Sequence, residues 1–201
     1  MEYTSNHNTP HTSFEINGRR YNAKSIKTLA FNHVANGSQN EIQLGNFILE
    51  WVNDIDFIAI QTSGTTSTPK VIRIPKASFI NSAKATATFF GLDAGDSALC
   101  CLPFSFIAGK MMLVRAWVLG LKLDIIEPSS YPLEHLSEKF YDFSAMVPLQ
   151  LQNSISKINQ IKTLLVGGAS VSEALALKLK GHTTTVFETF GMTETVSHIA
   201  A

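Results

Sequence analysis

The sequence predicts an α/β fold, with a doubly wound, mostly parallel sheet and helices on both of its faces. From Phe57 onward, short apolar segments alternate with longer segments of helical periodicity, which is the pattern of successive strand–helix units. The short segments, such as 98–102 and 143–147, are almost continuously apolar. Strands have this composition when both faces of a parallel sheet are covered.

The first 56 residues come before this alternation. Residues 1–11 are polar and are expected to form a loosely attached tail. Asn17-Gly18 lies between two short runs and predicts a β-hairpin. Helices are expected over 24–36, ended by Gly37, and over 41–53. We therefore divide the chain into a tail (1–11), a hairpin with two helices (12–56) and an α/β domain (57–201).

The elements of the α/β domain follow in order. Strands are expected over 57–61, 71–74, 98–102, 121–126, 143–147, 162–166 and 184–189. Helices are expected over 76–90, 107–119, 132–140, 148–155 and 172–180, with Pro148 opening one, Ser172 capping another and Gly91, Gly120 and Gly181 ending three. Because ligands gather at the carboxyl ends of parallel strands, the loops 62–70, 167–170 and 190–195 are the candidate site.

Composition restricts the class of partner. The 201 residues are 45% hydrophobic and 16% charged, with a formal net charge of zero, which argues against nucleic acid or an anionic membrane. Cys100 and Cys101 are adjacent in an apolar run and are expected to be buried free thiols, as suits the cytoplasm. No apolar run reaches the roughly 18 residues of a membrane span, and no histidine pair forms a convincing metal site.

The segment 62–70 contains six hydroxyl side chains, Gly64, Pro69 and Lys70, with no acid and no large apolar group. Hydroxyl and backbone donors with one cation are suited to a polyphosphate, although such a composition also occurs in surface turns. A P-loop of the Gly-x-x-x-x-Gly-Lys-Ser/Thr type is excluded, because Pro69 stands at the second glycine and Val71 follows the lysine.

The same segment resembles the Thr-Ser-Gly-Thr-Thr-Gly-x-Pro-Lys signature of the adenylate-forming superfamily, with Ser67 in place of its second glycine. Thr189-Phe190-Gly191-Met192-Thr193-Glu194-Thr195 resembles that family's later aromatic-Gly-Met-Thr-Glu motif. The continuation Val196-Ser197-His198-Ile199 is similar to the o-succinylbenzoate–CoA ligase branch. The resemblance covers roughly residues 57–201 and implies that the chain is the N-terminal part of the large domain of such an enzyme.

The resemblance implies a nucleotide site with ATP and Mg²⁺. The expected phosphate-binding residues are Thr62, Ser63, Gly64, Thr65, Thr66, Ser67 and Lys70, and the expected adenine and α-phosphate contacts are Gly167, Gly168, Ala169, Phe190, Gly191, Met192 and Thr193. Glu194 is expected to bind the magnesium ion, and Lys70, Thr193 and Glu194 are the expected catalytic residues. Two alternatives stay open: Gly167-Gly168 as a tight turn, and Phe190 as a core residue.

For the acid substrate, Phe106 replaces the histidine of the family's Leu-Pro-x-x-His-x-x-Gly segment, and Ser197 and His198 follow the magnesium motif. These three are the expected substrate contacts. Residues 147–151 resemble a Val-Pro-Thr-Gln-Leu segment of the same branch. Lys110 or Arg115 could meet a second carboxylate, but a solvated helix face is the favoured interpretation for both.

The implied function is an ATP-dependent acid–CoA ligase, with a small aromatic carboxylic acid and coenzyme A as substrates and o-succinylbenzoate as the expected acid. The alternatives are another aryl- or acyl-CoA ligase and a non-catalytic nucleotide-binding module. The family's Thr-Gly-Asp motif and mobile C-terminal domain are absent from the 201 residues, so this fragment is expected to be inactive alone. A sheet edge exposed at the point of truncation leaves a homodimer open.

Overall fold

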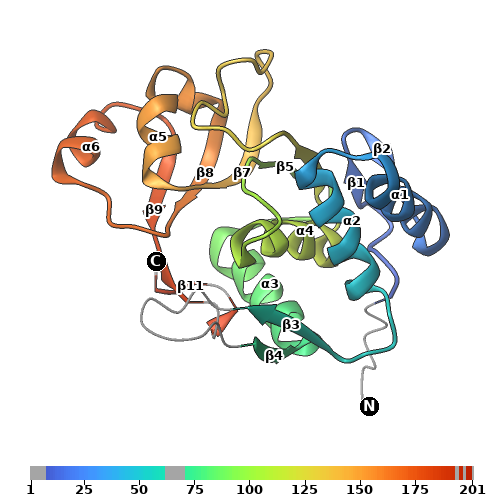
Figure 1. The fold of residues 1–201 in the computed structure, drawn as a ribbon. Coiled ribbons are helices and arrows are strands. Elements are labelled where there is room, and N and C mark those ends of the chain that lie inside the picture. The colour runs from blue at the N-terminus through green and yellow to red at the C-terminus, as the bar shows by residue number, and fades with distance from the viewer. Residues whose placement is uncertain (1–7, 62–70, 193–194, 197, 201) are drawn as a thin grey trace.

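The computed structural model describes residues 8–61, 71–192, 195–196 and 198–200. Its centre is a seven-stranded sheet with the order β2-β1-β6-β5-β7-β8-β9 (Figure 1). All neighbours in this sheet are parallel except the β1–β2 hairpin. The strands are β1 Glu15–Ile16, β2 Arg19–Arg20, β5 Ser97–Cys100, β6 Lys122–Ile125, β7 Tyr141–Met146, β8 Ile161–Val166 and β9 Thr185–Glu188. The predicted α/β, mostly parallel fold is confirmed.

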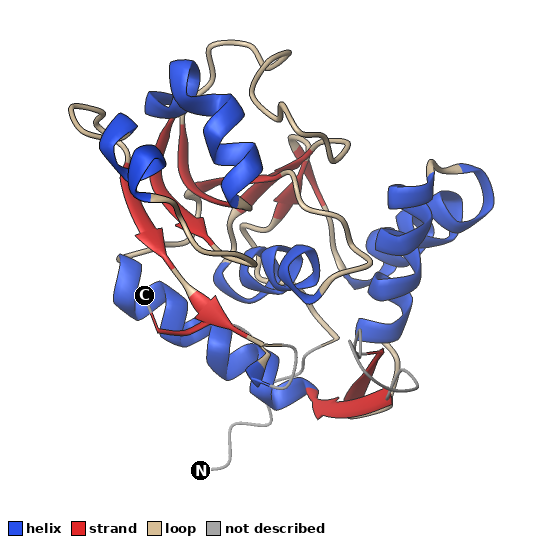
Figure 2. Ribbon diagram, turned by 60° about the vertical axis from the view of Figure 1, so that its left-hand side comes forward, coloured by secondary structure: helices blue, strands red, loops and turns tan. Residues whose placement is uncertain are grey.

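Helices cover both faces of the sheet (Figures 1 and 2). They are α1 Ala23–Asn36, α2 Gln39–Trp51, α3 Lys76–Phe90, α4 Ile107–Leu119, α5 Pro148–Ser154 with the 3₁₀ helix η1 Ile155–Gln160, and α6 Glu173–Lys178. Local chemistry sets several of their ends. Ser38 and Ser172 cap α2 and α6 through their side chains, and Gly91 and Gly120 end α3 and α4 in the left-handed conformation.

The sheet separates two hydrophobic cores. One lies against α1 to α4 and includes Cys100 and Phe143, and the other lies against α5, η1 and α6 and includes Cys101. Successive strand residues point to opposite faces, so the adjacent cysteines enter different cores. Both are buried free thiols, as predicted. None of the described helices is long and apolar enough to cross a membrane.

The N-terminal segment is joined to the central sheet. The hairpin turns at Asn17 and Gly18, which both have positive φ (48° and 73°), as a two-residue hairpin loop requires. Strand β1 then pairs with β6 of the central sheet, and Asn17 Oδ1 accepts a hydrogen bond from the Ile125 N–H. The described part of the expected tail also docks, because the His11 N–H donates to the Trp117 carbonyl of α4 (2.9 Å).

The strand before the candidate phosphate loop is not part of the parallel sheet, which corrects the expectation from its apolar sequence. β3 (Phe57–Gln61) pairs antiparallel with β4 (Val71–Pro75) in a separate two-stranded sheet, and only alternate β3 residues are buried. The hairpin is held on α2, whose Glu50 accepts a hydrogen bond from the Ala59 N–H (3.0 Å). Residues 62–70 therefore connect two antiparallel strands.

The helix expected over 132–140 is also wrong, because this segment forms turns. Side chains from η1 occupy backbone carbonyls that a helix would use for its own hydrogen bonds. Lys157 Nζ donates to the Glu134 carbonyl (2.8 Å) and Gln160 Nε2 donates to the Ser137 carbonyl (3.5 Å). These tertiary contacts replace a local helix of about two and a half turns, which is marginal by itself.

Candidate active site

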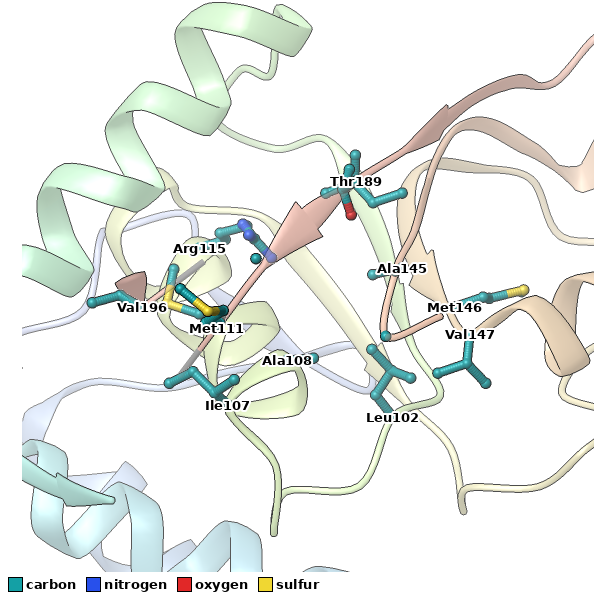
Figure 3. A pocket seen from close by; sticks show the side chains of 15 residues that line it. Leu102, Ile107, Ala108, Met111, Arg115, Ala145, Met146, Val147, Thr189 and Val196 are labelled. Atoms are coloured by element: carbon teal, nitrogen blue, oxygen red, sulfur yellow. The ribbon is translucent and has the colours of Figure 1, made fainter. Parts of the chain in front are cut away.

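A pocket opens where the carboxyl ends of β5, β7, β8 and β9 meet the start of α4 (Figure 3). Its volume is about 290 Å³. Most of the lining is apolar, with one guanidinium and one hydroxyl side chain. The lining residues are Leu102, Ile107, Ala108, Met111, Arg115, Ala145, Met146, Val147, Leu165, Gly167, Gly168, Thr189, Gly191, Met192 and Val196. The pocket lies at the sheet edge where ligands of open α/β folds bind.

Two of the predicted loops meet in this pocket because a glycine allows them to. An added Cβ at Gly167 would lie 2.8 Å from Thr189 Oγ1, so a larger residue would separate the loops after β8 and β9. Gly168 has φ +84°, the left-handed conformation that glycine adopts without strain. The Thr189 N–H donates to the Val166 carbonyl (2.7 Å) and fixes their alignment. The Gly-Gly turn therefore also forms part of the pocket wall.

Arg115 is buried, and this corrects the expectation of a solvated helix face. Its side chain is 3% exposed and lies with Met111 and Ala108 on the face of α4 that lines the pocket. Arg115 Nε donates to Thr86 Oγ1 of α3 (3.3 Å), and its guanidinium carbon lies 5.8 Å from the centre of the Phe143 ring. Burial lowers the pKa of Arg115 from 12.5 to about 10, so the group is cationic at neutral pH.

Lys110, the other candidate for a second carboxylate, points elsewhere. Its ammonium lies 5.3 Å from the centre of the Phe47 ring on α2. Burial lowers the pKa of Lys110, and the negative charge of Glu50 opposes that shift. Lys110 is not among the residues that line the pocket, so the two cations of α4 have different surroundings and only Arg115 faces the cavity.

The remaining predicted residues divide into three groups. Gly191 and Met192 line the pocket, as do Gly167 and Gly168, whereas Ala169 and Phe106 are not among its lining residues. Phe190 in β10 (Phe190–Gly191) is 60% exposed, which rules out the core alternative and leaves its ring accessible. Residues outside the described part of the chain are Thr62, Ser63, Gly64, Thr65, Thr66, Ser67, Lys70, Thr193, Glu194 and Ser197, and for His198 only the backbone, in β11 (His198–Ala200), is described.

Sequence reasoning missed Gln150, which forms hydrogen bonds with the backbone of segments that line the pocket. This side chain is 5% exposed, on α5. Its Nε2 donates to the carbonyls of Cys101 (3.0 Å) and Ser129 (2.9 Å), and its Oε1 accepts from the Val147 N–H (3.2 Å). One amide therefore ties together the segments that follow β5, β6 and β7. The only signal for Gln150 in the sequence was the resemblance of residues 147–151 to the Val-Pro-Thr-Gln-Leu segment.

Residues 50–201 match the family described as AMP-binding enzyme. The chain therefore belongs to the AMP-binding enzyme family, and the fold and the position of the pocket agree with that membership.

Within that family the chain is similar to CoA ligases. It is 25% identical over 193 residues to 2-succinylbenzoate–CoA ligase of Bacillus cereus (strain ATCC 10987), covering 92% of this chain and 39% of that protein. An acyl-CoA synthetase (AMP-forming)/AMP-acid ligase II-like protein from Dyadobacter fermentans has 37% identity and a TM-score of 0.75, covering 86% of this chain and 51% of that one. The o-succinylbenzoate coenzyme A synthetase of Bacillus subtilis, solved with ATP and magnesium ion, has 26% identity and a TM-score of 0.63, covering 70% of this chain and 31% of that one. The chain thus spans about two fifths of the length of the curated relative from B. cereus.

Proposed function

We propose that the chain carries the acid-binding and part of the nucleotide-binding site of an ATP-dependent acid–CoA ligase whose acid is o-succinylbenzoate. The observation that carries the proposal is Arg115, a buried cation that lines an otherwise apolar pocket beside the Gly167-Gly168 turn. An apolar cavity with a single convergent cation is suited to an aromatic acid with a second, non-reacting carboxylate. The names of the relatives in B. cereus and B. subtilis support the same acid.

The reaction has two steps. A carboxylate oxygen of the acid attacks the α-phosphorus of ATP, the bond to the bridging oxygen breaks, and pyrophosphate leaves. The thiolate of coenzyme A then attacks the activated carbonyl carbon, a C–S bond forms, and AMP leaves with the electron pair of the broken C–O bond. We assign Lys70, Thr193 and Glu194 to the first step, in which negative charge must be offset at phosphorus.

The described residues fit a nucleotide at one end of the pocket. Gly167 and Gly168 present backbone without side chains to the cavity, so a flat base could approach them closely. The exposed ring of Phe190 lies in the neighbouring strand and offers a face for stacking. Bound ATP with Mg²⁺ would supply the leaving group and the charge that offsets it, and Glu194 is our proposed ligand for the metal.

The acid is proposed to lie between α4 and the ends of β5 and β7. In Figure 3, Arg115, Met111 and Val196 lie toward one end of the pocket, and Leu102 and Val147 lie toward the other. The apolar side chains would hold the aromatic ring, and the guanidinium would pair with the carboxylate that does not react. A charge-assisted pair is strong where water is excluded, so this contact would favour dicarboxylic over monocarboxylic aromatic acids.

The test is ligand binding, followed as thermal stabilisation of the 201-residue chain. A non-hydrolysable o-succinylbenzoyl-adenylate mimic is compared with a plain benzoyl-adenylate mimic, because a ligand specific for the folded state adds about 2.7 kcal/mol of stability at a hundredfold excess over Kd. We expect a clear shift with the first mimic and a much smaller one with the second. Arg115→Met should remove this difference, and Lys110→Met, a change to a cation on the same helix outside the pocket lining, should preserve it.

Other results would favour the alternative functions. Equal shifts with the two mimics would keep the adenylate site and indicate another aryl- or acyl-CoA ligase. A shift with ATP–Mg²⁺ but with neither acyl mimic would favour a non-catalytic nucleotide-binding module. If Lys110→Met abolished the preference and Arg115→Met did not, the assignment of the second carboxylate to Arg115 would be wrong.

A further inference from the structure

We propose that Thr86 of α3 is a positioning residue that orients Arg115 and thereby sets the preference for acids with a second carboxylate. The inference rests on the proposed function, because it concerns the same carboxylate. Thr86 belongs to a different helix from Arg115 and is not among the lining residues of the pocket. Its effect on the ligand would therefore be transmitted only through the guanidinium.

The hydroxyl of Thr86 has a defined orientation. The side chain is 1% exposed, and its Oγ1 donates its single hydrogen to the Ser82 carbonyl (2.9 Å). A hydroxyl that has used its only hydrogen presents lone pairs to its other neighbours. The other neighbour is the Nε–H of Arg115, at 3.3 Å. Thr86 thus acts as an acceptor fixed on one helix for a cation carried by the next.

Holding Nε determines the plane of the guanidinium. Nε lies at the end of the last flexible bond of the arginine side chain, and the Nη groups are coplanar with it. The position of that plane is further limited by the Phe143 ring, 5.8 Å from the guanidinium carbon, and by Met112 Sδ, 3.8 Å from Nη1. Arginine recognises a carboxylate through a planar fork, so a guanidinium whose plane is already set loses less rotamer entropy when the acid binds.

A threonine within a helix often bonds the carbonyl four residues earlier for purely local reasons. Thr88, two residues further along α3, provides this local case. Its Oγ1 donates to the Lys84 carbonyl (3.1 Å) on the exposed side of the helix. Thr88 therefore shares the residue type, helix and back-bond of Thr86. Within the described part of the chain it makes no hydrogen bond to an arginine, so it is a matched control.

The experiment measures the affinities of the o-succinylbenzoyl-adenylate and benzoyl-adenylate mimics for four variants of the chain by calorimetry. Thr86→Val keeps the side-chain shape and removes the acceptor. We expect it to weaken binding of the succinylbenzoyl mimic about tenfold, the effect of roughly one hydrogen bond, and to leave binding of the benzoyl mimic unchanged. Thr86→Ser, which keeps the hydroxyl, should retain the affinity of the original chain, and Thr88→Val should match it for both mimics. Arg115→Met is the fourth variant.

Each other outcome overturns a different statement. If Thr86→Val keeps the ratio of the two affinities while Arg115→Met loses it, Thr86 has no positioning role and the proposed function stands. If Thr86→Val weakens both mimics equally, its role is structural and the inference is wrong. If the unaltered chain binds the two mimics equally and Arg115→Met changes neither, the proposed function itself fails.

Discussion

Replacing Gln150 by leucine should destabilise the chain substantially, although Gln150 contributes only an uncharged amide. The change keeps most of the side-chain volume. It removes two hydrogen bonds that the amide donates and one that it accepts. It leaves the Cys101 and Ser129 carbonyls and the Val147 N–H without their protein partner. These groups belong to the segments after β5, β6 and β7, so the change would loosen the contacts between segments that form the pocket wall.

The magnitude follows from the burial of the three groups. The bond to the Cys101 carbonyl is fully buried, whereas those to Ser129 and Val147 are partly buried. An unsatisfied buried group costs about 1–3 kcal/mol, and a lost bond at a site that water can reach costs about 0.5–1 kcal/mol. The sum for Gln150→Leu is about 2–5 kcal/mol of unfolding free energy.

The assay is urea unfolding followed by tryptophan fluorescence, since Trp51 and Trp117 are both buried and should report the loss of the core. The matched control is Asn153→Leu on the same helix. Asn153 also donates to a carbonyl of the neighbouring loop, that of Ser130 (3.0 Å), but at an exposed position. We expect the control to lose less than about 1 kcal/mol. Equal losses for both variants, or a loss below about 0.5 kcal/mol for Gln150→Leu, would refute the role of Gln150 in holding these three segments together.

Two further predictions concern packing and pH. Gly109→Ala should cost about 1–3 kcal/mol of unfolding free energy through overpacking, because the new Cβ would lie 2.4 Å from the Pro103 carbonyl oxygen; a urea midpoint equal to that of the unaltered chain would contradict the tight contact of α4 with this segment. Burial raises the pKa of the Cys100 thiol from 9.0 to about 12 and raises the pKa of Cys101 in the same direction. The folded chain therefore keeps both protons when the unfolded chain has lost them, so stability is complete below pH 9 and falls above it. Each thiol should account for a loss on the order of 1 kcal/mol at about pH 10. The double variant Cys100→Ala/Cys101→Ala should show a flatter decline of unfolding free energy between pH 8 and about pH 10 than the unaltered chain. An equal decline in both proteins would show that the thiols titrate over the same pH range in the folded and the unfolded chain.

Much of the fold was predictable from local patterns. Strands 57–61 and 71–74, helices 76–90 and 107–119, and the hairpin at Asn17-Gly18 match the structure to within a residue or two, because apolar periodicity and glycine or proline stops act within a few residues of each element. Two motifs in the right order also indicated the family. The segment 132–140 failed for the opposite reason, since its backbone carbonyls bond to Lys157 and Gln160 of η1.

The local pattern also does not specify which sheet a predicted strand joins. The apolar run 57–61 is a strand as predicted, but nothing in it specifies whether its partner is β4 or a strand of the central sheet. Pairing depends on where α2 and α3 place the hairpin, and Glu50 contributes to that placement through its bond to Ala59.

The sequence by itself determined the strand–helix order, the family and the loops that form the candidate site, because motifs and periodicity are short-range properties of the chain. Only the tertiary structure decided that Arg115 faces a pocket while Lys110 packs on Phe47. Both are cations on one predicted helix, and their surroundings are supplied by other elements. The hydrogen bonds of Thr86 and Gln150 have the same origin, since they join residues that are 21 to 49 positions apart in the chain. Distant contacts of this kind are set by how helices pack on the sheet.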